Sequence, residues 1–149
     1  MDKRSTVLAA TALTAVAGAG IIATSLPGAA APGSAGTGPV HLGAVLVGGN
    51  EVTAGDTDGY GLADVHVARR EICWKITVSG VDTIAAAHIH AGPSKVSGPV
   101  VVPLVPVDKG CTEVPRRTAR FIADHPSQWY VNVHNAEFPA GALRGQLRK

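Results

Sequence analysis

Residues 86–93 read AAHIHAGP, and residues 130–134 read YVNVH. In an extended strand the side chains alternate between two faces, so His88 and His90 project to one side while Ile89 projects to the other. The same period places the two valines of the second segment on a packing face and its tyrosine, asparagine and histidine on the opposite face. Each segment therefore predicts a strand that carries a polar face with histidines on it.

Alternating or short apolar runs recur on both sides of these segments, separated by turn residues, and this pattern is typical of half-buried antiparallel strands. The predicted strands are residues 40–47, 61–69, 72–79, 84–91, 100–107, 128–134 and 142–148. Pro103 and Pro106 cannot donate to a central ladder, so the segment that contains them is predicted at a sheet edge. Residues 116–124 predict one short helix that ends before Pro126. We expect an all-β, antiparallel, Greek-key-like β-sandwich of about seven to eight strands with one short helix.

The first part of the chain has the build of a secretory signal peptide. Residues 1–4 include two basic side chains, and residues 5–26 are uncharged and largely apolar. We predict a signal peptide over residues 1–31, with an uncleaved membrane anchor as the alternative, since about 20 residues can span a bilayer. Residues 32–39 are rich in Pro, Gly, Ala, Ser and Thr and predict a flexible linker, so the folded domain is expected over residues 40–149. The mature protein is thus expected to be secreted or extracytoplasmic and free of the membrane.

The charge of the mature chain is close to neutral. The whole chain has 13 basic and 11 acidic residues, and removal of residues 1–31 leaves 11 basic and 10 acidic residues. Such a balance gives no electrostatic reason to expect nucleic acid as a partner. The remaining length of about 118 residues is that of one domain with a single core, and we expect it to be a monomer.

Both cysteines, Cys73 and Cys111, lie in the part of the chain that is predicted to be exported. In an oxidising compartment a single disulfide between them is the natural expectation. The alternative is a pair of free thiols.

Six motifs follow one another along the predicted domain: GGNEV at residues 48–52, GDTDGYG at 55–61, AHIH at 87–90, GPVVV at 98–102, YVNVH at 130–134 and FPAGALRGQL at 138–147. In order and spacing they resemble the CHRD domain, a module named for its repeats in chordin that also occurs alone in secreted bacterial proteins. The resemblance covers about residues 40–147. It departs from the family after Val52, where Thr53 and Ala54 stand in place of the usual prolines.

The CHRD resemblance implies an exported module with a binding or structural role. In chordin the repeats belong to an extracellular antagonist of growth-factor signalling, and the bacterial members have no agreed activity. The expected partner is accordingly an extracellular protein or a cell-envelope ligand. Chemistry has to be argued from the residues of this chain, because a fold does not determine a function.

His88, His90 and His134 form a candidate metal triad. Neutral imidazole is a good ligand for copper and zinc, and a His-x-His pair on one strand face directs two nitrogens toward one point. A third histidine on a neighbouring strand would complete three ligands and leave one position open. Copper or zinc is the expected cofactor if the triad binds a metal.

The His-x-His segment also resembles the copper strand of Cu,Zn superoxide dismutase, which is itself an antiparallel sandwich. By that resemblance Arg144 would be the arginine near the metal, and the protein would be a copper-dependent oxidoreductase. Two features depart from that enzyme. Residues 92–98 are short and contain no histidine, and a fourth copper ligand would have to come from His41 or His66.

The alternative to a metal site is a hydrogen-bonded polar seam that includes the three histidines and Asn132. In this interpretation Arg144 and Glu51 pair nearby and satisfy buried groups. No serine lies in a motif that places it beside a base, and the cysteines are expected to be bonded together, so no catalytic residue is predicted.

Overall fold

The computed structural model describes residues 38–149. The predicted signal peptide, residues 1–31, and all but the last two residues of the predicted linker, residues 32–39, lie outside the described part of the chain. Within residues 38–149, no helix has the length and apolar character needed to cross a membrane.

Eight strands and one α-helix make up the described part of the chain, together with two short 3-10 turns. The strands are β1 (Val40–Val47), β2 (Tyr60–Val67), β3 (Glu71–Ser79), β4 (Ala86–Ala91), β5 (Val100–Pro103), β6 (Lys109–Glu113), β7 (Trp129–His134) and β8 (Leu143–Gln146). The helix α1 spans Arg116–Asp124 and ends ahead of Pro126, as the sequence predicts. The all-β class with one short helix is therefore confirmed.

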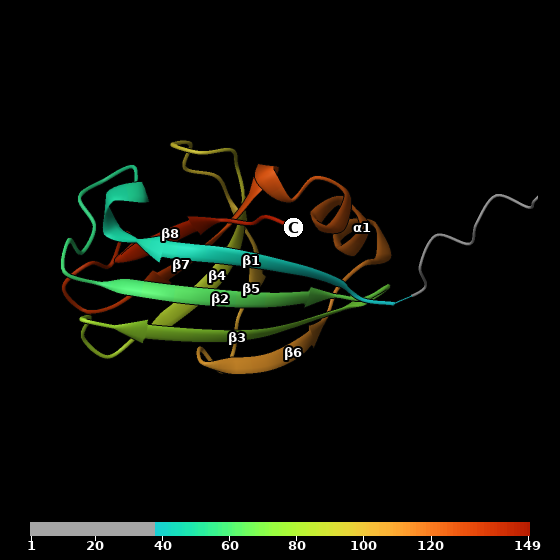
Figure 1. Cartoon of the computed structure of the whole chain (residues 1–149), viewed down its shortest axis with the longest axis horizontal. Helices are drawn as coiled ribbons and strands as arrows, with labels where there is room; N and C mark the ends of the chain where they lie inside the picture. The colour runs from blue at the N-terminus through green and yellow to red at the C-terminus, as the bar shows by residue number, and fades with distance from the viewer. Residues whose placement is uncertain (1–37) are drawn as a thin grey trace, which may run out of the picture. The chain divides into compact units, whose positions relative to one another are not determined.

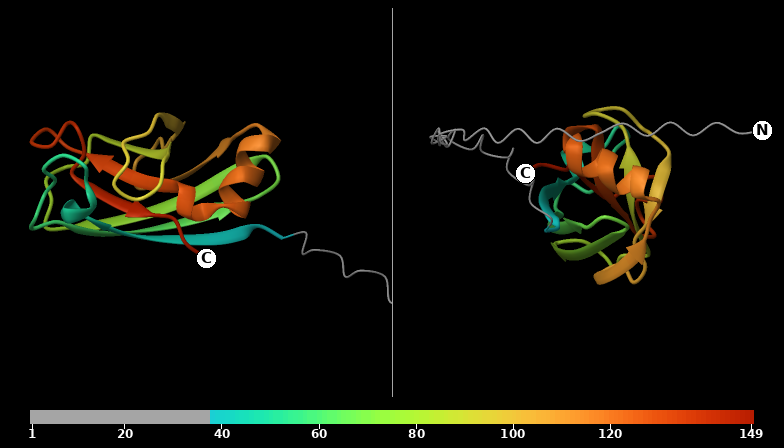
Figure 2. Two further views of the ribbon diagram at one scale, coloured as in Figure 1. Left: turned by 90° about the horizontal axis from the view of Figure 1, so that it is seen from above. Right: turned by 90° about the vertical axis from the view of Figure 1, so that its right-hand side faces the viewer.

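The strands form one antiparallel sheet in the order β5-β4-β7-β8-β1-β2-β3-β6. The sheet is curled, so that its two halves, β5-β4-β7-β8 and β1-β2-β3-β6, face one another across the core (Figures 1 and 2). Between β8 and β1 the pairing is sparse: one rung joins Val47 to Arg144, and one isolated bridge joins Gly43 to Arg148. The arrangement is thus a sandwich whose two halves are linked along one side. β5 lies at an edge as predicted, but it ends at Pro103, so the strand expected over residues 100–107 is shorter in the structure and Pro106 lies outside it.

Alternating apolar residues of both halves fill the core. In β2 the buried apolar side chains are those of Ala63, Val65 and Val67, and their neighbours in sequence point outward. Burying a side chain such as valine or isoleucine stabilises the fold by roughly 1.5–3 kcal/mol, which fixes the register of each strand. The helix α1 lies at one end of the curled sheet and buries Ala119 and Ile122 there (Figure 1).

β6 is the one strand that the sequence did not predict. Its residues, KGCTE, show no apolar alternation, because it is an edge strand that pairs only with β3. Cys73 and Cys111 form a rung of that pairing and a disulfide, with 2.10 Å between the sulfur atoms. Next to this rung Gly110 makes room for Trp74, since a Cβ at residue 110 would lie 2.9 Å from the indole. The predicted disulfide is confirmed, and it fastens β6 to the sheet.

Candidate functional site

The structure brings His88, His90 and His134 together on the polar face of β4 and β7. These three residues are called the histidine cluster below. β4 and β7 pair so that His134 lies opposite Ala86, two rungs from the rung that joins His88 to Asn132. One ring nitrogen of each histidine lies within 4.8 Å of the others. The closest approach is 3.2 Å, between Nδ1 of His88 and Nε2 of His134.

Backbone carbonyls orient two of the imidazoles. Nδ1 of His90 donates to the carbonyl oxygen of Gly98 at 2.9 Å, and Nδ1 of His134 donates to that of Pro139 at 3.0 Å. A carbonyl only accepts, so these bonds place the proton on Nδ1 and leave Nε2 of each ring as a hydrogen-bond acceptor. Nε2 of His90 is buried and has no hydrogen-bond partner. Histidines that bind metals are held in this way, with the second ring nitrogen donating to a carbonyl.

The surroundings favour the uncharged form of two of the imidazoles. Burial lowers the pKa of His88 below its usual value, and His134 and His90 lower it further. Burial also lowers the pKa of His90, and the charge of Arg144 lowers it further. The hydrogen bond to Gly98 raises this pKa, but its effect is smaller than that of burial. Both rings are therefore neutral at neutral pH, which is the state that binds a metal ion.

Arg144 is almost fully buried, with 1% of its surface exposed, and it lies over Tyr130 rather than against the histidines. Its guanidinium carbon is 3.4 Å from the centroid of the Tyr130 ring, and Nη2 donates to the carbonyl of Pro93 at 2.9 Å. The ring of His90 also stacks on Tyr130. Because β4 and β8 flank β7 on opposite sides, Tyr130 stands between the arginine and the imidazole.

Glu51 and Asn132 form a buried hydrogen bond beside the cluster, in which the Asn132 amide donates to Oε1 of Glu51 at 2.5 Å. Burial raises the pKa of Glu51, and the bond from Asn132 and the nearby charge of Arg144 counteract that effect. Among the described residues the only ion pair is the one between Arg120 and Asp124, so the expected pairing of Glu51 with Arg144 is replaced by the bond to Asn132.

The backbone of Gly141 packs directly against the hydrogen bond between Glu51 and Asn132. It has a positive φ of 146°, and a Cβ there would lie 2.6 Å from both the Asn132 amide nitrogen and the Glu51 carboxyl carbon. Only glycine combines this backbone conformation with such a close approach. The Ala-Gly-Ala turn at residues 140–142 is thus shaped around the two polar side chains.

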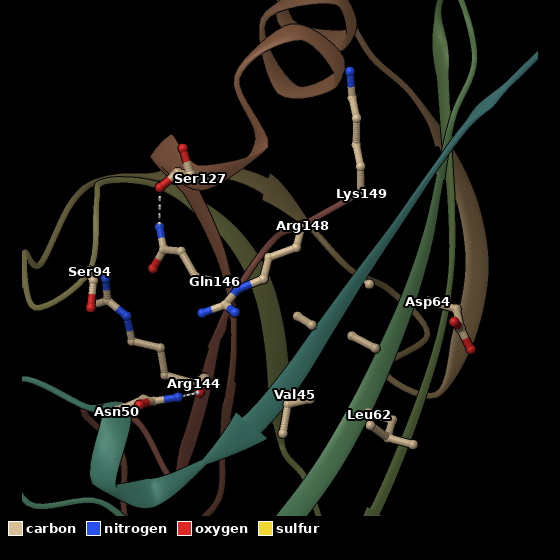
Figure 3. Close-up of a pocket in the computed structure, with 13 residues that line it drawn as sticks. Val45, Asn50, Leu62, Asp64, Ser94, Ser127, Arg144, Gln146, Arg148 and Lys149 are labelled. Carbon is tan, nitrogen blue, oxygen red and sulfur yellow. Dashed lines mark hydrogen bonds between the residues drawn. The ribbon is translucent and has the colours of Figure 1, made fainter.

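A groove of about 840 Å³ lies over the outer face of β8, β1 and β2 (Figure 3). Val45 and Leu62 are exposed along it, and Arg144 extends beside it toward Ser94 (Figure 3). The side-chain amide of Gln146 donates a hydrogen bond to the carbonyl oxygen of Ser127 at 2.9 Å. None of the three clustered histidines lines this groove, and Arg144 connects the two regions through its contact with Tyr130.

The sequence did not anticipate the parts of the site that depend on loops. The carbonyls of Gly98 and Pro139 orient imidazoles, and the hydroxyl of Tyr130 accepts a bond from the Gly98 amide at 3.2 Å. The only available signal was the Gly and Pro content of the segments that follow β4 and β7. His41 and His66, considered above as sources of a fourth copper ligand, lie on β1 and β2 and do not join the cluster.

A second group of potential ligands, Glu71 with the two cysteines, offers no thiolate because Cys73 and Cys111 are bonded to each other.

Comparison with protein families identifies one match: the model of the CHRD domain matches residues 42–147. No curated protein and no solved structure matches the chain. The match spans nearly all of the described residues, from β1 to the end of β8.

Proposed function

The chain belongs to the CHRD-domain family, and we propose that it is an exported binding module that holds one transition-metal ion on His88, His90 and His134. The family supports a binding or structural role. The disulfide is compatible with an extracytoplasmic location, because such bonds persist in oxidising compartments. The binding partner in this proposal is an extracellular protein or a cell-envelope ligand.

The spacing of the ring nitrogens is the observation that carries the metal proposal. Two imidazole nitrogens bound to one Zn²⁺ at about 2.0–2.1 Å, with a tetrahedral angle between them, lie about 3.3 Å apart. Nδ1 of His88 and Nε2 of His134 are separated by 3.2 Å. His90 offers its buried, unpartnered Nε2 from the same face of the sheet. Three neutral imidazoles suit zinc or copper and leave one position for water or a partner's ligand.

Metal binding in this arrangement requires one proton to move. Because the Nδ1 of His134 donates to Pro139, its Nε2 accepts the hydrogen bond, and Nδ1 of His88 carries the proton in the metal-free protein. An ion held by Nδ1 of His88 would require the other neutral tautomer of this ring: Nδ1 would give up its proton to solvent and Nε2 would take one up, so the net charge of the imidazole would not change. The three imidazoles would hold the ion and fix its position, and the ion would supply an electrophilic centre for a partner's ligand.

The geometry favours binding over redox catalysis. Arg144, the arginine expected near the metal in the superoxide dismutase comparison, is buried and separated from His90 by the ring of Tyr130. The described residues near the cluster include no thiol and no hydroxyl nucleophile paired with a base, so the site has the features of a fixed ligand set.

Elemental analysis of the purified protein after loading with zinc or copper and gel filtration tests this proposal. We expect the His88→Ala variant to lose the metal that the wild-type protein retains. His125→Ala is the matched control, because His125 follows α1 and lies outside the cluster. Equal metal content in the wild-type protein and the His88→Ala variant would overturn the assignment.

A further inference from the structure

A second pair of histidines lies on the other half of the sheet. His41 of β1 and His66 of β2 are direct cross-strand partners, and their ring centroids are 3.9 Å apart with 50° between the ring planes. Both side chains point to the outer face, because their neighbours Leu42, Val65 and Val67 are buried in the core. The closeness of the rings follows from the register, since Cβ atoms of directly opposed residues are about 4.5–5.5 Å apart.

The imidazoles of this pair are accessible and free of protein partners. His41 is exposed and His66 is partly exposed. Neither ring takes part in a side-chain hydrogen bond with any of residues 38–149, in contrast to the clustered histidines, whose Nδ1 atoms are all engaged. Four ring nitrogens are thus available at one place on the surface.

We propose that His41 and His66 form a second transition-metal site, a two-imidazole chelate for Cu²⁺, Zn²⁺ or Ni²⁺ that water molecules complete. A bound ion needs one nitrogen of each ring at about 2.0–2.1 Å. Binding would require rotation about the side-chain torsions to turn one nitrogen of each ring toward the ion, while the backbone rung stays fixed and holds the two residues directly opposite each other. Imidazole is a good ligand for all three ions.

The surface around the pair leaves room for a hydrated ion. The neighbouring rung on the same outer face joins Gly43 to Asp64, and a Cβ added at Gly43 would meet no atom within 4 Å. Both residues line the end of the groove shown in Figure 3. A ligand lying in the groove could therefore reach an ion held by the pair.

This second site binds more weakly than the histidine cluster, because it offers two imidazoles instead of three and no carbonyl orients its rings. It is also independent of the cluster, since the two sets of histidines stand on different strands of opposite halves of the sheet. The two sites can therefore be removed one at a time.

Titration calorimetry with ZnCl2 alone, on the wild-type protein and four single variants, tests the inference. The variants are His66→Ala, His41→Ala, His88→Ala and, as the control, His125→Ala. We expect two equivalents of zinc for the wild-type protein and the control. Loss of the weaker equivalent in both His41→Ala and His66→Ala, with the tighter one retained, supports the second site, whereas His88→Ala should lose the tighter one only.

A second measurement avoids substitutions altogether. In the NMR spectrum of the wild-type protein, the ring protons of His41 and His66 should broaden together when Cu²⁺ is added beyond one equivalent, while those of His125 stay sharp. The inference is wrong if His41→Ala and His66→Ala bind as much zinc as the control and if, in the wild-type protein, the ring signals of His41 and His66 stay sharp when Cu²⁺ is added. A single equivalent that disappears in His66→Ala but not in His88→Ala would uphold this site and refute the proposed function instead.

Discussion

The imidazole of His90 stacks on the ring of Tyr130, with 4.7 Å between the centroids and 13° between the planes. Tyr130 is 3% exposed and its hydroxyl accepts a bond from the amide of Gly98, whose carbonyl in turn accepts from His90. One tyrosine therefore fixes both the plane of the imidazole and the loop that orients it. Such supporting contacts position a ligand without touching the metal.

We expect Tyr130→Phe to keep the stack but lose the bond to the Gly98 amide. The cost to the free energy of unfolding should be about 1 kcal/mol, as for a typical buried hydrogen bond, and zinc should bind less tightly than to the wild-type protein. Chemical denaturation and zinc titration measure the two effects. The control is Tyr60→Phe, which changes a 45% exposed ring on β2 and should alter neither quantity. Identical behaviour of the two variants would show that the hydroxyl has no supporting role.

Gly141→Ala should destabilise the fold and disturb the Glu51–Asn132 bond. The added Cβ would meet both polar side chains at 2.6 Å, on a backbone with a φ of 146°. Strain and overpacking of this kind should lower the free energy of unfolding by about 2–4 kcal/mol. Gly49→Ala is the matched control, because a Cβ there meets nothing within 4 Å. A loss in Gly141→Ala no larger than that in the control would contradict the packing described for this turn.

The lowered pKa values of His88 and His90 predict a pH dependence of stability in the absence of metal. The unfolded chain binds protons on these residues near pH 6.5, whereas the folded protein resists protonation until a lower pH. Acidification therefore favours the unfolded state, and the free energy of unfolding should fall from about pH 8 to about pH 5.5.

Urea denaturation with a chelator present, at several pH values in this range, measures that slope. His88→Asn should show a shallower slope than the wild-type protein, because it has one fewer group with a lowered pKa. The raised pKa of Glu51 acts in the opposite direction, since protonation of a buried carboxyl on acidification favours the folded state. Equal slopes in the wild-type protein and His88→Asn would exclude His88 as a contributor.

Loss of the disulfide should loosen β6 without affecting the histidine cluster. Cys73 and Cys111 are 38 residues apart in sequence and join β6 to β3, on the half of the sheet that does not carry β4 and β7. The double variant Cys73→Ala/Cys111→Ala should lose about 2–4 kcal/mol of stability and retain its zinc stoichiometry. Calorimetry of unfolding and of zinc binding on the same sample measures both. Loss of the tighter zinc equivalent, the one assigned to the histidine cluster, in the folded double variant would mean that the two halves are coupled.

Strand alternation allowed most of the fold to be predicted from the sequence. The short apolar runs identified β1 with its observed bounds, and they predicted a strand over residues 72–79 where β3 spans Glu71–Ser79. β6 was missed because its five residues carry no apolar pattern, and its position depends on pairing with Cys73 of a strand distant in sequence. Periodicity reports burial, and an edge strand with little burial leaves no such signal.

The site was predictable only as far as strand geometry reaches. The shared face of His88 and His90 follows from alternation, and the approach of His134 follows from the pairing of β4 with β7. The partners of these residues come from loops whose backbone conformation is not encoded in a simple period. The bond between Glu51 and Asn132, in particular, depends on the positive φ of Gly141.

The most direct measurement is zinc K-edge X-ray absorption on the His66→Ala variant loaded with one equivalent of zinc, in which the pair of His41 and His66 can no longer bind an ion through two imidazoles. We expect three imidazole nitrogens at about 2.0–2.1 Å and one further light ligand in the first shell. A first shell with one imidazole or none would contradict a metal centre at His88, His90 and His134.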